Sequence, residues 1–184
     1  MKIISWNVNS IRAREPLVEK LIQKENPDIL CLQELKTEDK NIIDNFFQLH
    51  GYENISATQK AYNGVAIGYK NQNTIRTIDL DNLNTLQARN NCILIEDQKT
   101  VILNCYFPNG NPIGTDKFEL KTNWMKVMLE LLKELKREYN VIITGDFNVI
   151  PHDLDAHDIK KYKNDALASK EARKFFFSYK NLDL

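Results

Sequence analysis

In the segment Asn140–Asp158, "NVIITGDFNVIPHDLDAHD", an apolar run ends abruptly in Gly-Asp-Phe-Asn. The apolar run predicts a buried strand, and Gly, Asp and Asn are common turn residues, so a simple turn before Pro151 is one interpretation. A chemical interpretation is also open. Residues two apart in an extended segment point the same way, so we expect Asp146 and Asn148 to share one face. A carboxylate beside a carboxamide suits a divalent cation, a water molecule or a phosphate.

Composition restricts the class of protein. The 184 residues predict a single domain, 1–184, whose core needs no disulfides. Lys plus Arg and Asp plus Glu both number 25, which argues against binding nucleic acid through bulk charge but leaves room for a local basic patch or a bound cation. Three cysteines in apolar runs predict reduced core residues: Cys31, Cys92 and Cys105. No apolar run is long enough for a signal peptide or a membrane span, so we expect a cytoplasmic protein without a membrane partner.

Apolar periodicity along the chain predicts a mixture of strands and helices. Strands are expected at 2–8, 27–34 and 140–147, and helices at 15–26, 41–51, 118–135 and 169–182. Five further strand-length runs lie between the second and third helices. In the first helix, Leu17, Leu21 and Ile22 are expected to face the core, with Pro16 in the first turn. Ser169 is the expected N-cap of the last helix. This mixture predicts an α/β or α+β fold with sheets packed under helices.

Polar residues recur where predicted strands end. Asn7 and Glu34 end the first two strands, as Asp146 and Asn148 end the later one. Each residue alone is compatible with a turn or a solvated strand end, but the recurrence favours a site, because strand ends in layered sheets commonly form the site crevice. Magnesium prefers hard oxygen ligands, typically one or two carboxylates with a substrate phosphate. Tyr106 follows another apolar run and offers a phenol beside the same chemistry.

Six motifs occur in an order that resembles the exonuclease III family of AP endonucleases: "ISWNVNSIRAR", "PDILCLQELKT", "YNGVAIGYK", "NCYFPNG", "DKFELK" and "GDFNVIPHDLDAHD". "LQE" with "GDFN" marks only the endonuclease/exonuclease/phosphatase superfamily, whereas "NSIRAR", "LQELK" and "DLDAHD" together indicate the exonuclease III branch. The resemblance implies a four-layered αββα sandwich of the DNase I-like type. It covers the N-terminal two-thirds of that fold, so we expect its last strands to be lacking.

The resemblance also implies roles for particular residues. A magnesium ion, or alternatively manganese, is expected at a site built from Asn7, Glu34, Asp146 and Asn148. Asp146 is expected to orient or deprotonate the attacking water, Asn148 to stabilise the transition state, and Tyr106 to lie near the scissile phosphate. Candidate DNA contacts, each also compatible with an ordinary solvated surface, are Asn9, Arg12, Arg89, Asn109, Lys117 and Lys121.

The leading functional hypothesis is therefore a magnesium-dependent nuclease for double-stranded DNA, with 3′→5′ exonuclease and AP endonuclease activities at 3′ ends and abasic sites. Two alternatives remain: a superfamily phosphatase acting on a small phosphoester, and a non-catalytic fragment that binds DNA or a protein partner. The family's catalytic histidine belongs to a terminal Ser-Asp-His that does not occur up to Leu184. If the chain is complete as given, we expect very low activity, and uncovered sheet edges favour self-association over the expected monomer.

Overall fold

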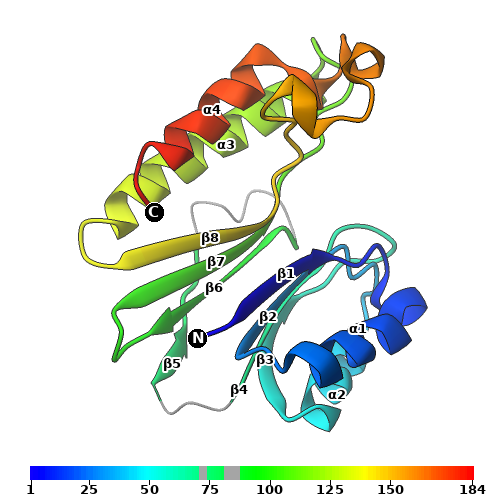
Figure 1. Cartoon of the computed structure of the whole chain (residues 1–184), viewed down its shortest axis with the longest axis vertical. Coiled ribbons are helices and arrows are strands. Elements are labelled where there is room, and N and C mark those ends of the chain that lie inside the picture. The colour runs from blue at the N-terminus through cyan, green and yellow to red at the C-terminus, as the bar shows by residue number, and fades with distance from the viewer. Residues whose placement is uncertain (71–73, 81–87) are drawn as a thin grey trace. The chain divides into compact units, whose positions relative to one another are not determined.

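The computed structural model describes residues 1–70, 74–80 and 88–184 (Figure 1). These residues form eight strands, four α-helices and three short 3₁₀ helices. The chain divides into two compact units. Unit 1 comprises Met1–Tyr106 with Ile142–Asp146, and unit 2 comprises Phe107–Val141 with Phe147–Leu184. The single-domain organisation stays a prediction.

The first sheet of unit 1 has the strand order β1-β2-β4-β3. The strands are β1 (Ile3–Asn7), β2 (Ile29–Gln33), β3 (Tyr52–Ala57) and β4 (Val65–Lys70). β1 and β2 are parallel, and β4 runs antiparallel to both β2 and β3. In the strand register, Asn7 of β1 pairs with Gln33 of β2, and Gln33 pairs with Val65 of β4. The last residues of β1 and β2 therefore lie at one end of the sheet, which we call its carboxyl end.

Two helices of unit 1, α1 (Ile11–Glu25) and α2 (Lys40–Leu49), lie against the first sheet (Figure 1). Their apolar side chains pack with strand residues in one buried cluster that includes Val18, Ile43, Phe47, Leu30 and Leu32. Gly68 of β4 makes room for this packing, because a Cβ atom there would lie 2.0 Å from a ring carbon of Phe47. The second helix confirms the expected segment, which was 41–51.

The first helix begins earlier than predicted. It starts at Ile11, so Pro16 lies inside the helix rather than in its first turn. The N–H of Ile11 donates to the carbonyl of Leu35 at 3.2 Å, and the Ile11 side chain is buried, so tertiary contacts fix the start of the helix immediately after β1. The predicted core face is also partly wrong. Val18 is buried, whereas Leu17 is 49% exposed.

The second sheet has the order β5-β6-β7-β8. The strands are β5 (Ile75–Thr77), β6 (Asn90–Ile95), β7 (Thr100–Tyr106) and β8 (Asn140–Asp146). Within unit 1 this sheet meets the first sheet through a buried apolar cluster that includes Ile29, Ile67, Ile93 and Ile102. Helices, first sheet and second sheet therefore form three layers of unit 1.

The three cysteines are buried free thiols, as predicted from the sequence. Burial raises the pKa of Cys31 and of Cys92 to about 12. Burial likewise raises the pKa of Cys105, with further increases from the two neighbouring thiols. The thiols therefore stay protonated near neutral pH and act as small apolar core residues.

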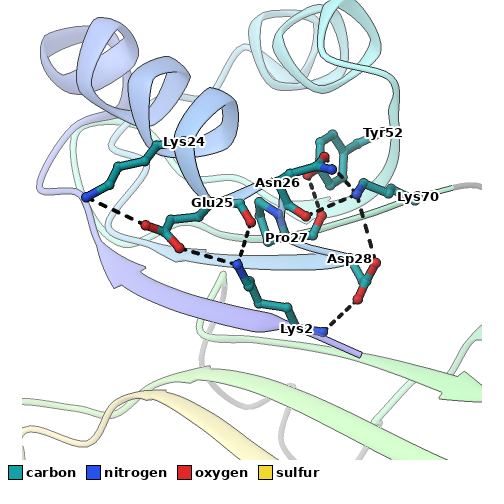
Figure 2. A network of polar contacts seen from close by, with 8 residues as sticks. All are labelled: Lys2, Lys24, Glu25, Asn26, Pro27, Asp28, Tyr52 and Lys70. Carbon is teal, nitrogen blue, oxygen red and sulfur yellow. Dashed lines mark hydrogen bonds and ion pairs between the residues drawn. The ribbon is translucent and has the colours of Figure 1, made fainter.

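The other end of the first sheet, its amino end, is closed by a polar network (Figure 2). The backbone N–H of Lys2 donates to Asp28 Oδ2 at 2.6 Å, and Lys2 Nζ donates to the carbonyl of Glu25 at 2.7 Å. Lys70 Nζ donates to Asn26 Oδ1 at 2.9 Å. These contacts join the starts of β1 and β2 to the end of α1 and the end of β4.

Unit 2 contains α3 (Asp116–Leu135) and α4 (Lys170–Lys180), which lie side by side (Figure 1). The hydroxyl of Tyr179 donates to the carbonyl of Met125 at 2.7 Å. Ser169 Oγ accepts from the N–H of Ala172 at 3.1 Å, so the predicted N-cap is confirmed. The 3₁₀ helices are η2 (Asp153–Asp155), η3 (Ile159–Tyr162) and η4 (Ala166–Ala168). In the part of the chain that the structure describes, no helix is both long and apolar enough to cross a membrane.

Candidate active site

The structure brings Asn7, Glu34 and Asp146 together in unit 1. Asn7 ends β1, Glu34 directly follows β2, and Asp146 ends β8. Asn7 Nδ2 donates to Glu34 Oε1 at 2.9 Å and to Asp146 Oδ2 at 2.8 Å. One amide group therefore holds two carboxylates close to each other.

The glycine of the Gly-Asp pair permits a close approach of two strands. Gly145 has φ 132°, and a Cβ atom there would lie 1.9 Å from the carbonyl oxygen of Cys105. Only glycine fits where the backbones pass so closely. This approach fixes the backbone directly before Asp146, which explains why an apolar strand ends in Gly-Asp.

Asn148 lies beyond the end of β8, in a different local conformation from the one expected. Its φ of 48° is left-handed, so the alternation of an extended strand stops before it. Within unit 2, Asn148 Nδ2 donates to the carbonyl of Phe107 at 2.8 Å. The carbonyl of Asn148 in turn accepts from Lys121 Nζ at 2.6 Å. The strand alternation from which a shared face was predicted therefore ends before Asn148, and the shared face of Asp146 and Asn148 stays a prediction.

Glu34 is a half-buried carboxylate with three side-chain donors. Lys36 Nζ lies 2.8 Å from Glu34 Oε2, and Asn7 and Tyr106 also donate to the carboxylate. Burial alone would raise the pKa of Glu34, but these hydrogen bonds and the charge of Lys36 together lower it below its ordinary value. Glu34 is therefore ionised at neutral pH.

Tyr106 and Arg89 form the other side of this site in unit 1. The guanidinium carbon of Arg89 lies 4.9 Å from the centre of the Tyr106 ring, and Arg89 Nη1 donates to the Tyr106 carbonyl at 3.2 Å. Burial, the charge of Glu34 and the hydrogen bond to Glu34 raise the pKa of Tyr106 to about 12, against the opposing effect of Arg89. The phenol therefore stays protonated and donates to Glu34.

The backbone around these residues is locally strained. Asn9, Ser10, Glu34 and Lys36 all have left-handed φ angles, of 46°, 91°, 55° and 53°. Such conformations cost about 1–3 kcal/mol each and persist only where the surroundings hold them. Here the N–H of Ser10 donates to the carbonyl of Glu34 at 2.7 Å, so the turn after β1 and the turn after β2 hold each other.

The donor set fits magnesium. Glu34 and Asp146 supply hard carboxylate oxygens close together, and magnesium commonly uses one or two carboxylates with waters and substrate phosphate. Among the residues described, no three His, Cys, Asp or Glu side chains cluster as a metal site. The Asn7 carbonyl oxygen accepts from the N–H of Asn9 at 3.0 Å. This contact turns the Asn7 amide nitrogen toward the two carboxylates.

The candidate DNA contacts fall into different environments. Asn9, Arg12, Asn109 and Lys117 are exposed, as a phosphate contact requires. Arg89 instead packs on Tyr106. The interpretation of Lys121 as a surface contact is wrong. Its side chain is fully buried at 0% exposure, and its ammonium donates to the carbonyls of Asn109 and Asn148 at 3.0 and 2.6 Å. A buried ammonium needs such partners, and this one secures the loops that carry them.

Three residues at the site were not singled out from the sequence. Lys36 pairs with Glu34 and also donates to Asn9 Oδ1. The "LQELK" motif contained this lysine, so its spacing of two from Glu34 was a usable signal. Gln33 and Asn104 are buried amides inside apolar runs. Two sequence signals were usable for them: each is a polar residue in an otherwise apolar strand, and each lies in a motif quoted above, Gln33 in "LQELK" and Asn104 in "NCYFPNG".

Comparison with known proteins assigns the family. The model of the endonuclease/exonuclease/phosphatase family matches residues 4–182. This chain belongs to that family. The exodeoxyribonuclease of Bacillus subtilis is 30% identical over 178 residues, which cover 96% of this chain and 69% of the relative. The chain spans between 50% and 64% of four further curated relatives.

Two solved structures share the fold. An AP endonuclease from Archaeoglobus fulgidus superposes with a TM-score of 0.86 at 30% identity, covering 99% of this chain and 70% of that protein. A Neisseria 3′ phosphatase bound to a product DNA hairpin gives the same TM-score and identity, covering 99% and 71%. The predicted fold class, α/β or α+β of the DNase I-like type, is confirmed, with two sheets and four α-helices in the described residues. The resemblance to exonuclease III-type AP endonucleases is confirmed too.

Proposed function

We propose that this family member is a metal-dependent phosphodiesterase of the exodeoxyribonuclease III type, acting on double-stranded DNA at abasic sites and 3′ ends. The observation that carries the proposal is the pair of carboxylates, Glu34 and Asp146, held by one amide of Asn7. Two carboxylates held close together supply the hard oxygen ligands that magnesium commonly takes from proteins, with substrate phosphate completing the set.

Each residue has a proposed part in hydrolysis. Glu34 and Asp146 hold magnesium or manganese, which supplies positive charge for the developing oxyanion when bound. Asn7 keeps the two carboxylates in place. Asp146 orients or deprotonates the attacking water, as general base catalysis requires. Tyr106, protonated because its pKa is raised to about 12, is a hydrogen-bond donor for a phosphate oxygen. Asn148 of unit 2 is proposed to stabilise the transition state.

DNA contacts are proposed for the exposed candidates, and one of them gives a clear test. Each phosphate contact contributes about −0.9 to the slope of log affinity against log salt concentration for duplex DNA. The net charge of zero predicts few contacts and a shallow slope. Lys117→Ala should make the slope shallower by about 0.9, whereas Lys126→Ala, an exposed control on the same helix, should not change it. Affinity that is insensitive to salt would remove DNA from the proposed partners.

A second candidate is removal of a 3′ phosphate from DNA. The Neisseria relative, described as a 3′ phosphatase with a product DNA hairpin, favours this activity. It uses the same proposed site, because phosphomonoester and phosphodiester hydrolysis both need a positioned water and stabilisation of phosphoryl oxygens.

Three substrates separate these functions. The purified chain is incubated with an abasic-site duplex, a duplex ending in a 3′ phosphate, and a small phosphoester, each with magnesium and with EDTA. We expect magnesium-dependent turnover of the DNA substrates that is lost in Asp146→Asn. Preferential turnover of the small phosphoester would replace the DNA proposal with the superfamily phosphatase. DNA binding without turnover of any substrate would favour a non-catalytic fragment.

A further inference from the structure

Two buried carboxamides connect the two sheets of unit 1 next to the candidate site. Gln33 ends β2 and is 1% exposed, and Asn104 lies in β7 and is 0% exposed. Gln33 Nε2 donates to Asn104 Oδ1 at 2.6 Å. Asn104 Nδ2 donates to the carbonyls of Leu32 and Ala66 at 3.0 and 2.9 Å. We call the Gln33–Asn104 pair the amide tie.

The amide tie is a directional polar contact beside the apolar cluster of the same interface. The neighbouring inter-sheet residues include Ile29, Ile67 and Ile102, which pack without directional contacts. Buried carboxamides cost free energy unless they are hydrogen-bonded, whereas apolar side chains of similar size need no partners. Hydrogen bonds depend on distance and angle, so the amide tie fixes the two sheets relative to each other more narrowly than apolar packing does.

The amide tie is connected to three strands that carry site residues. Gln33 directly precedes Glu34. Asn104 lies two residues before Tyr106 in β7, so both side chains are on the same side of the strand. Gln33 Nε2 also donates to Ser5 Oγ at 3.0 Å, two residues before Asn7 in β1. Each of these strands is therefore held within two residues of a site side chain.

We propose that Gln33 and Asn104 are positioning residues, which hold Glu34 of the first sheet against Tyr106 of the second for the chemistry of the site. The inference rests on the proposed function for its catalytic consequence, but its structural part does not need that function. A misplacement of about 1 Å caused away from the chemistry can cost about 10²-fold in rate. An inter-sheet contact that excludes such movement therefore contributes to activity without touching substrate.

The test replaces both amides with apolar residues, in Gln33→Met/Asn104→Leu. Ile102→Val, in the same interface and strand as Asn104, is the matched control. The first readout is the side-chain amide ¹H–¹⁵N signals of Asn7 without metal or DNA, assigned by their loss in Asn7→Asp. These signals report the contacts of Asn7 with both carboxylates. We expect them to move in the double variant and to stay in place in Ile102→Val.

The second readout separates positioning from general destabilisation. On the abasic duplex, we expect kcat to fall by about 10-fold or more in the double variant, with KM changed by less than about 3-fold. Unmoved Asn7 signals in a folded double variant would overturn the proposal. If the double variant does not fold, the same Asn7 signals are measured in Gln33→Asn, which keeps the carboxamide on a side chain shorter by one methylene. If the unaltered chain cleaves no DNA, the proposed function fails while the Asn7 signals still decide the positioning role.

Discussion

The two ends of the first sheet use charged and polar side chains in different ways. At the amino end, Lys2 Nζ lies 3.3 Å from Glu25 Oε2, with side chains 53% and 35% exposed, so solvent screens the pair (Figure 2). At the carboxyl end, the Glu34 side chain is only 17% exposed and shares the Asn7 amide with Asp146. The first arrangement joins the ends of strands and of a helix, whereas the second holds two carboxylates together, as the proposed cation site requires.

The backbone differs between the same two ends. At the amino end, Asn26 has a left-handed φ of 46°, which is the common conformation at the end of a helix, and its N–H donates to Ile22. At the carboxyl end, Glu34 and Lys36 adopt left-handed φ angles that no helix end explains. Strain of this kind accumulates at sites where function needs a fixed geometry. This difference is the one expected if the amino end serves stability and the carboxyl end serves the proposed chemistry.

The largest expected effect comes from removing one carboxylate charge at the carboxyl end. Asp146→Asn should lower the turnover of an abasic-site duplex by about 10²–10⁴-fold, because it removes the proposed base while keeping an oxygen for the Asn7 amide. Asp28→Asn at the amino end is the matched control and should leave turnover within about 2-fold. Steady-state kinetics measure both. Equal losses of turnover in the two variants would show that the carboxyl end has no special part in catalysis.

The next effect concerns cation affinity. Asn7→Ala removes the amide that both carboxylates share, so magnesium affinity should fall by about 10–100-fold, as for other residues that orient metal ligands. Asn26→Ala, which removes an amide from the amino end, should leave affinity unchanged. Calorimetric titration of the metal-free chain with magnesium measures this. Undiminished affinity in Asn7→Ala would mean that the carboxylates need no shared donor.

Alkaline pH should lower the free energy of unfolding, because Tyr106 at the carboxyl end ionises there. The folded pKa of about 12 lies above the ordinary value of 10.0, so the stability that Tyr106 contributes is fully present below pH 10.0 and is lost as pH rises through about 12. Tyr106→Phe should therefore lose less stability than the unaltered chain over this window. Urea unfolding at a series of alkaline pH values compares them. The other tyrosines occur in both chains and cancel. Parallel curves would show that Tyr106 has an ordinary pKa in the folded protein.

The smallest effect is expected at the amino end itself. Lys70→Met removes the contacts of Lys70 with Asn26 and an ion pair with Asp28 at 3.9 Å, whose side chains are about one-third exposed. Such exposed pairs contribute about 0–1 kcal/mol, so the free energy of unfolding should fall by less than about 1 kcal/mol. Chemical denaturation measures it. A loss several times larger would show that the amino end is a cooperative network rather than a set of screened pairs.

Local patterns in the sequence predicted much of the fold. The strand at 140–147 and the last helix with its Ser169 cap depend on periodicity and capping within a few residues, and both are found. The start of α1 was missed because contacts of Ile11 with a distant turn set it, against the local signal of Pro16. The burial of Lys121 was missed because two carbonyls from separate loops hold its ammonium.

Local sequence patterns are enough to predict which polar residues end the apolar strands, namely Asn7, Glu34 and Asp146, because strand period and polar interruption are local properties. Their contacts with one another, in contrast, depend on the packing of the two sheets. Asn7 is 27 residues from Glu34 and 139 residues from Asp146 in the sequence. No local sequence pattern therefore predicts the hydrogen bonds between them. The same holds for the amide tie, whose two members are 71 residues apart. Hydrogen bonds need donor and acceptor at a defined distance and angle, and that geometry exists only after the sheets have packed.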